Sequence, residues 1–368
     1  MARTQSSFDL PFLLITIGLV LFGLIMLSSA SGPTGYQNFG DSYYFVKHQL
    51  LFGLIPGMIG LVFFLRFPYQ HIKKYAFNLL VVSVILLLVV FIPGVGFGTS
   101  HSWIRFGGLF SVQPAELVKL TFLFYLAAWL EKRQGSVGDV SEGLRPFLMA
   151  LGIVLGLIAL QPDIGTMAII AAMSFTVYFS AGAPVVYLLG IGGIGFALFA
   201  LLIKIAPYRA ARFTTFLHPE LDPQGIGYHI NQALLAIGSG GMFGLGYGLS
   251  RQKFAYLPEV VGDSIFGVIA EELGFIITVG LIALFVAFVW RGLKIAAASQ
   301  DLYGRYLVVG ILAWIGIQAF VNIGSMTSIL PMTGVTLPFV SYGGTSLAVC
   351  LAGVGVVLSV SRSMKREV

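Results

Sequence analysis

Hydrophobic runs recur along the whole chain, and they constrain its fold more than any other feature. Each run of about 16 to 25 apolar residues is long enough to cross the ~30 Å hydrocarbon core of a membrane as a helix. Composition agrees, because 10% of the residues are charged, whereas soluble domains carry roughly 25%. We therefore predict an all-α polytopic membrane protein with a single membrane domain over residues 1–368. Ten transmembrane helices are predicted, near residues 10–29, 50–65, 76–93, 114–130, 147–160, 164–182, 185–203, 265–290, 306–323 and 345–360.

The basic residues predict the orientation of these spans. An even number of spans places both termini on one side of the membrane, and Lys and Arg in short loops favour the cytoplasmic side. With the N-terminus inside, thirteen of the 21 Lys and Arg residues lie on the inner side. Both termini are therefore predicted to be cytoplasmic. The net charge of +6 then reflects topology and attraction to anionic lipid, so a nucleic-acid partner is not implied.

Three outer segments, 28–49, 94–113 and 204–264, are longer than ordinary connections. The last, between the seventh and eighth predicted spans, keeps many aromatic and apolar residues and is not expected to be disordered. Its apolar pattern over 230–237 predicts a short helix that lies on or dips into the outer leaflet, closed by a glycine-rich turn. The six glycines that follow lack the dinucleotide-binding spacing, which excludes a nucleotide loop.

Three acidic residues, Glu116, Asp163 and Asp263, stand at the starts of predicted spans. One interpretation is that they complement helix N-termini, each contributing ~0.3 to 1 kcal/mol. The other is that they mark a functional path, because ionisable groups are costly inside a membrane. The second is favoured by a gathering of cationic residues on the same outer face: Arg105, Lys119, Arg209, Arg212, Arg251 and Lys253.

Spacing along the helices predicts how some of these charges behave. Glu116 and Lys119 share a helical face, and we expect a structural ion pair that keeps a polar cavity open nearby. Glu271 and Glu272 follow Asp263 by eight and nine residues, which places them about 12 to 14 Å deeper on a straight helix. We expect them to act in packing or helix pairing, with at least one hydrogen-bonded or protonated.

Several kinds of catalytic site are excluded by what the sequence lacks. The five histidines have no metal-ligand spacing on one helix, which makes a zinc site improbable. The one cysteine, Cys350, allows no internal disulfide and lies in an apolar stretch that predicts core packing. A G-x-S-x-G elbow is absent, and a Ser-His-Asp triad has no local support.

Motifs spread over the chain resemble the SEDS family, the polytopic shape, elongation, division and sporulation proteins. The resemblance runs from about Phe8 to Arg366 and is carried by "VQPAELVKL", "LQPDIGT", "RFTTFLHPELDPQGIGYHINQALLAIGSGG", "RQKFAYLPEVVGD" and "LPMTGVTLPFVSYGGTS". Within the family, "SRQKFAYLPE" and "TGVTLPFVSYGG" are more similar to the division member FtsW than to the elongation member RodA.

The resemblance implies a peptidoglycan glycosyltransferase of the bacterial cytoplasmic membrane. Its implied substrates are lipid II and the nascent glycan strand, and its implied partners are a class B penicillin-binding protein and other divisome or elongasome membrane proteins. The family's catalytic aspartate corresponds to Asp263, and its buried ion pair corresponds to Glu116 and Lys119. Family members usually carry Thr and Phe beside the aspartate, whereas this chain has Gly262 and Ser264.

The chemistry expected of such an enzyme gives roles to the charged residues. Asp263 would act as general base toward a sugar hydroxyl, or instead as a ligand of a divalent cation such as Mg or Mn. The departing pyrophosphate needs positive charge, for which the candidates are Arg105, Arg209, Arg212, Arg251 and Lys253. The alternative function is a flippase or transporter of lipid-linked precursors, which would carry its charges near the midplane of the bilayer.

Overall fold

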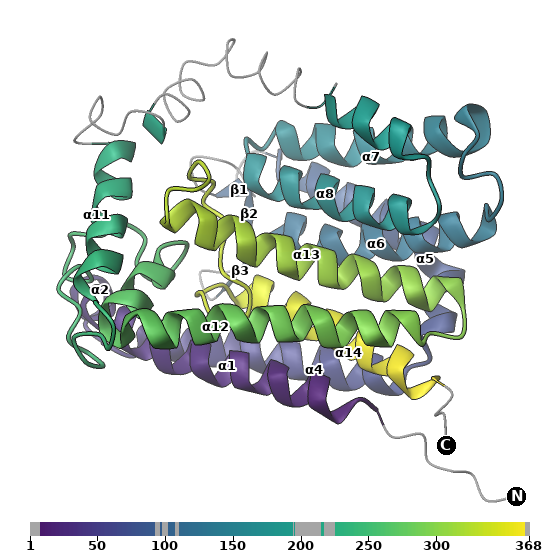
Figure 1. Ribbon diagram of the computed structural model, residues 1–368. Helices are drawn as coiled ribbons and strands as arrows, with labels where there is room; N and C mark the ends of the chain where they lie inside the picture. The colour runs from purple at the N-terminus through teal and green to yellow at the C-terminus, as the bar shows by residue number, and fades with distance from the viewer. Residues whose placement is uncertain are drawn as a thin grey trace, which may run out of the picture.

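The computed structural model describes residues 8–92, 96–97, 102–106, 110–193, 195, 215–216 and 225–364. Most of its helices lie lengthwise beside one another and form one bundle (Figure 1). The two ends of the described chain meet, since the amide of Asp9 donates to Ser361 Oγ at 3.0 Å. The bounds of the helices, including the π-helical turns η1 and η2, are α1 Leu10–Ala30, α2 Gly32–Phe39, α3 Tyr44–Gln49, η1 Leu50–Leu54, α4 Ile55–Arg66, α5 Tyr69–Val89, α6 Pro114–Lys132, η2 Val140–Leu144, α7 Arg145–Ala159, α8 Ile164–Ser180, α11 Ile226–Ser239, α12 Ile265–Ala297, α13 Leu302–Met326 and α14 Gly344–Arg362.

These bounds confirm an all-α membrane fold, although not its expected count of ten spans. Within the described residues, seven helical segments are long and apolar enough to cross a membrane. The helix α8 has 17 residues, and α6 carries four charged residues within its 19. Nine of the nineteen residues of the seventh predicted span, 185–203, lie outside the described residues, as do 19 of the 61 residues of the 204–264 segment. The chain is a multi-pass membrane protein.

Carboxylates fix the beginnings of three helices. The amide of Phe12 donates to Asp9 Oδ1 at 2.9 Å at the start of α1, and that of Gly304 donates to Asp301 at 2.6 Å at the start of α13. The amide of Thr166 donates to Asp163 Oδ1 at 2.9 Å, which makes Asp163 the N-cap of α8. Each carboxylate satisfies a backbone N–H that has no partner within the helix.

The helices α13 and α14 form the centre of the bundle, since most of their apolar side chains are buried. Small residues let α14 approach α4 closely. A Cβ at Gly355 would lie 2.5 Å from the carbonyl oxygen of Leu61, so a larger side chain would separate the two helices. Such contacts stabilise membrane bundles because helices in lipid associate through packing and hydrogen bonds.

A small antiparallel sheet, which the sequence analysis did not predict, precedes α6. Its strands are β1 Gly96–Phe97, β2 Trp103–Phe106 and β3 Phe110–Val112, in the order β1-β2-β3. In the register of the second pair, Ile104 lies opposite Val112. The last strand leads through one residue into α6, and so sets where that helix begins.

Two departures from regular helix lie near the end of the bundle opposite the chain ends. Gly274 bends α12 with φ 75° and ψ −178°, a conformation that glycine adopts readily. The predicted span near 265–290 falls within this helix, which is long and apolar enough to cross a membrane. The segment 331–337, between α13 and α14, has no regular secondary structure although several of its residues are buried. In lipid, such backbone is stable only where protein groups satisfy it.

Candidate functional site

Asp263 lies in the turn-rich segment that precedes α12. The helix begins at Ile265 with Ser264 as its N-cap residue, so Asp263 stands just before the cap. Its side chain is half-buried, and Oδ1 accepts a hydrogen bond from Ser264 Oγ at 3.2 Å. Gly334 lies opposite, where a Cβ would be 3.9 Å from Oδ2 of Asp263. Gly334 has φ +72° and is exposed, so at this point the 331–337 segment carries no side chain toward the carboxylate.

Hydrogen bonds from two other elements fix the Asp263 segment. The buried side chain of Asn322, on α13, donates from Nδ2 to the carbonyl oxygens of Asp263 and Val335, at 2.7 Å each. The amide of Tyr342 donates to the carbonyl oxygen of Val261 at 2.8 Å. The backbone on either side of the carboxylate is therefore tied to the segment between α13 and α14.

The Tyr342 side chain adds a further contact at this end of the bundle. Its hydroxyl lies 2.9 Å from His48 Nδ1, which joins the segment before α14 to α3. Burial raises the pKa of Tyr342 to about 12, so the hydroxyl stays protonated at neutral pH.

Glu116 and Lys119 form the expected ion pair, 2.6 Å apart, with both side chains buried. The ammonium also donates to Gln318 Oε1 at 2.8 Å and lies 5.1 Å from the ring centre of Trp314. One acid, one base, an amide and an aromatic face thus share a buried site between α6 and α13. A buried charge of this kind depends on its partner.

A polar line on α13 connects this ion pair to Asp263. Gln318 accepts from Lys119 and also donates to the carbonyl oxygen of Thr336 at 2.9 Å. Asn322 follows four residues later, on the same face of the helix, and holds Val335 and Asp263. The sequence analysis missed both amides. The available signal was two polar side chains inside an apolar span, a pattern that commonly marks function.

Three acceptor oxygens along this line have no hydrogen-bond partner among the described residues. They are Glu116 Oε2, Asn322 Oδ1 and Thr333 Oγ1, and each is buried. A buried polar atom without a partner is rare in folded proteins and calls for an explanation. All three belong to residues of the line or to the segment beside Asp263.

The predicted cationic residues do not all meet Asp263. Arg105 is exposed on β2, and Arg251 is exposed on the outer loop. Arg209 and Arg212 lie outside the described residues. Lys253 is buried and forms an ion pair with Glu272 at 2.8 Å. The expectation that Lys253 is free to bind pyrophosphate is therefore corrected, because its charge is already neutralised inside the protein.

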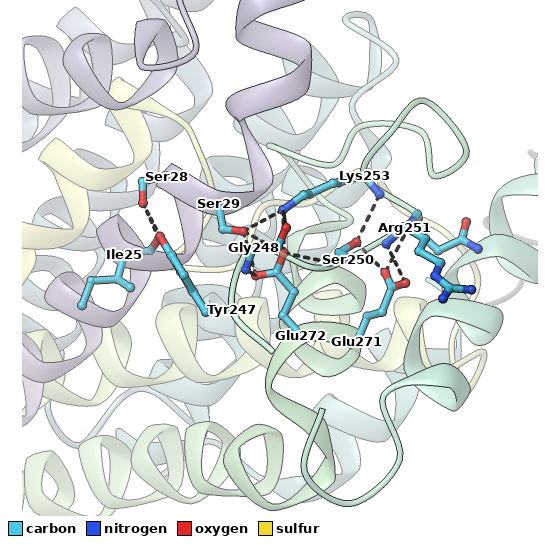
Figure 2. A network of polar contacts seen from close by, with 11 residues as sticks. Ile25, Ser28, Ser29, Tyr247, Gly248, Ser250, Arg251, Lys253, Glu271 and Glu272 are labelled. Atoms are coloured by element: carbon cyan, nitrogen blue, oxygen red, sulfur yellow. Dashed lines mark hydrogen bonds and ion pairs between the residues drawn. The ribbon is translucent and has the colours of Figure 1, made fainter. Parts of the chain in front are cut away.

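Glu271 and Glu272 organise the loop that leads to Asp263 (Figure 2). Glu272 accepts hydrogen bonds from Ser29 Oγ at 2.7 Å, from the amide of Gly248 at 3.1 Å and from Lys253 Nζ at 2.8 Å. Glu271 accepts from the Ser250 side chain and from the amides of Arg251 and Gln252.

The expectation that at least one of the two glutamates is hydrogen-bonded is thus confirmed. The helix α12 is regular from Ile265 through both glutamates and bends only at Gly274, immediately after the pair. The two carboxylates contact a loop that folds back along the helix.

The described residues contain no group of three or more His, Cys, Asp or Glu side chains able to hold a metal ion.

Comparison with known proteins identifies the family of the chain. A family model for FtsW, RodA and SpoVE, described as "Cell cycle protein", matches residues 10–366. Stage V sporulation protein E of Bacillus subtilis is 43% identical, over 98% of this chain and 99% of its own. A probable peptidoglycan glycosyltransferase FtsW of Trichlorobacter lovleyi is 41% identical, over 98% of this chain and 94% of its own.

Solved structures give the same relationship. A chain from the structure described as "Structural coordination of polymerization and crosslinking by a peptidoglycan synthase complex" has a TM-score of 0.81 and 29% identity, covering 98% of this chain and 99% of its own. The rod shape determining protein RodA of Thermus thermophilus has a TM-score of 0.71 and 28% identity, with 98% of each chain covered. FtsW relatives thus match more closely in sequence than this RodA, as expected. The chain belongs to the FtsW, RodA and SpoVE family of cell cycle proteins.

Proposed function

We propose that Asp263 is the general base of a glycosyl transfer that extends peptidoglycan strands from lipid II. The chain is a peptidoglycan glycosyltransferase, as its family membership and the names of its FtsW relatives indicate. The observation that carries the role of Asp263 is its position: a half-buried carboxylate opposite an exposed glycine, on a backbone segment that α13 and the segment before α14 hold by hydrogen bonds.

The proposed step is one displacement with inversion. Asp263 takes the proton from the 4-hydroxyl of the acceptor sugar as the oxygen attacks the anomeric carbon of the donor strand. The new C–O bond forms as the bond between that carbon and the pyrophosphate oxygen breaks, and the lipid pyrophosphate leaves with the bonding electrons. An α-linked donor thereby gives a β-linked strand. A well-placed general base typically accelerates such a reaction by ~10² to 10⁴-fold.

The leaving pyrophosphate needs positive charge as it departs. The exposed side chains of Arg105 and Arg251 are the candidates among the described residues, and Arg209 and Arg212 remain candidates from sequence. A Mg or Mn ion, when bound, would neutralise phosphate charge, and Asp263 would then be its ligand. The proposal therefore has two forms: in one, Asp263 is the general base, and in the other it is a ligand of the divalent cation.

The orientation and partners follow from the same proposal. With both termini cytoplasmic, the Asp263 end of the bundle faces outward, where a strand would be polymerised. The solved relative belongs to a complex that coordinates polymerisation and crosslinking. This supports a class B penicillin-binding protein as partner, in septal or elongation synthesis.

The test is polymerisation of purified lipid II, followed on a gel, with the partner present and absent and with chelator added. Wild-type protein should give glycan strands, and Asp263→Asn should give almost none while eluting as a folded monodisperse species. A wild-type protein that moves lipid II across vesicles but forms no strands would support the flippase instead. Loss of activity with chelator alone would favour the ligand role of Asp263.

A further inference from the structure

The loop that Glu271 and Glu272 hold is unusually apolar on its outside. We call residues 240–252 the outer hairpin. Its stretch from Gly240 to Ser250 contains no charged residue. Five of its large side chains are exposed, and Phe243 is the most exposed of them at 83%. Exposed apolar patches of this kind mark a contact surface. The five are Met242, Phe243, Leu245, Tyr247 and Leu249.

Much of the backbone of the outer hairpin is paired within the protein. Eight of the thirteen N–H groups over residues 240–252 donate to protein acceptors, all of them from Gly244 onward. Glu271 and Glu272 accept six of these bonds, four with their carboxylates and two with their carbonyl oxygens. Backbone groups close to lipid need such partners, because each unpaired group would cost several kcal/mol there.

The hairpin also continues the lipid-facing surface of the bundle. The amides of Phe275 and Ile276, freed where α12 bends, donate to the carbonyls of Gly241 and Met242 at 2.8 and 3.3 Å. From this point α12 exposes apolar side chains, including Phe275 at 60% and Ile277 at 45%. On the other side, the Tyr247 hydroxyl donates to the carbonyl of Ile25 on α1 at 3.0 Å (Figure 2). The exposed apolar side chains of the hairpin thus adjoin those of two spans.

We propose that the outer hairpin inserts into the adjoining membrane leaflet, with Met242, Phe243 and Leu249 in contact with phospholipid acyl chains. Glu271 and Glu272 stabilise this insertion because they pair backbone amides of the hairpin, while Lys253 forms an ion pair with Glu272 inside the protein. This inference concerns the membrane contact of the chain and does not depend on the role of Asp263.

The test measures the surroundings of position 243 in purified protein reconstituted into phospholipid nanodiscs. A nitroxide is attached at Phe243→Cys in a Cys350→Ala background, and its collisions with oxygen and with a water-soluble nickel complex are compared. Ile277→Cys provides the lipid control. Gln134→Cys, exposed in the turn after α6, provides the aqueous control. The oxygen-to-nickel ratio at 243 should match that at 277 and exceed that at 134 severalfold.

Two results would overturn the proposal. A ratio at 243 equal to that at 134 would place the hairpin in water, and shielding from both reagents would mean that protein covers it. A second pair of variants checks the outcome without a label. Phe243→Asp should lower the midpoint of thermal unfolding in nanodiscs well below that of Phe243→Leu, whereas a hairpin in water would tolerate both changes equally.

Discussion

Two buried groups of charges stand near the same end of the bundle, and they are built differently. Glu116 and Lys119 form a minimal pair, in which one carboxylate oxygen of Glu116 has no partner among the described residues. Glu271, Glu272 and Lys253 combine two acids with one base, and backbone amides and serine hydroxyls complete their hydrogen bonding. The second group carries more charge but is better satisfied.

The two groups therefore differ in how strongly their stability depends on their lysine. In the first, Lys119 is the main compensation for a buried carboxylate, and the group continues through Gln318 toward the Asp263 segment. In the second, Lys253 is one donor among several. The first group should therefore be sensitive to loss of one partner, and the second should tolerate it better.

The largest expected effect is that of Lys119→Ala. It leaves Glu116 buried without its cation, a change that typically costs about 3 to 5 kcal/mol. Folded yield, measured by fluorescence-detected size exclusion, and the midpoint of thermal unfolding should both fall, together with activity. Lys132→Ala, at an exposed position of the same helix, is the matched control. Normal yield and stability with lost turnover would instead indicate that Lys119 acts directly in the reaction.

Lys253→Met should have a smaller effect, about 1.5 to 3 kcal/mol, as expected for loss of a hydrogen bond to a charged group. Glu272 keeps its donors from Ser29, Gly248 and Ser250. Thermal unfolding of this variant is compared with that of Arg251→Met, whose side chain is exposed. A loss of thermal stability as large as that of Lys119→Ala would show that both groups depend equally on their lysine.

Asn322→Leu tests whether the polar line of α13 reaches the Asp263 segment. It leaves the carbonyls of Asp263 and Val335 without their shared donor, at about 1 to 3 kcal/mol for a buried unsatisfied group. The turnover number should fall more than the KM changes, since the backbone beside the carboxylate loses its support. Asn78→Leu, exposed on α5, should leave both parameters at wild-type values. An unchanged turnover number in Asn322→Leu would show that Asn322 does not support Asp263 in the reaction.

The smallest effect is expected at the exposed pair of Asp41 and Lys47, 2.7 Å apart. The hydrogen bond from Lys47 lowers the pKa of Asp41 below its ordinary value of 3.8. Its contribution to stability is therefore present above that value and is lost as the pH falls through the lowered pKa. Thermal unfolding of Asp41→Asn should differ slightly from wild type at neutral pH, and the difference should vanish in strong acid. A large difference at neutral pH would contradict the view that exposed pairs contribute little.

Much of the fold was accessible from the sequence because apolar runs report directly on membrane spans. The predicted start of α6 at residue 114 and that of α12 at residue 265 agree with the structure. The bend at Gly274 was not predictable, since this is one of 46 glycines and its conformation depends on contacts with the outer hairpin. The short strands before α6 were missed because they are two to four residues long.

The residues of the candidate site likewise include some that could be predicted from the sequence and some that could not. The Glu116 and Lys119 pair was predictable because it is local, three residues apart on one helix. Lys253 was misassigned because its partner Glu272 is nineteen residues away and meets it only through the folded loop. Asn322 was missed because its partners lie on two other segments. Tertiary contacts of this kind leave no periodic signal in the chain.

The most direct measurement of the central claim is the kinetics of lipid II polymerisation by Asp263→Asn, made on protein whose thermal unfolding matches wild type. The account predicts substrate affinity close to that of wild type and a turnover number lower by ~10² to 10⁴-fold, the contribution of a general base. Turnover close to the wild-type rate would contradict it, because the carboxylate would then have no part in the chemistry.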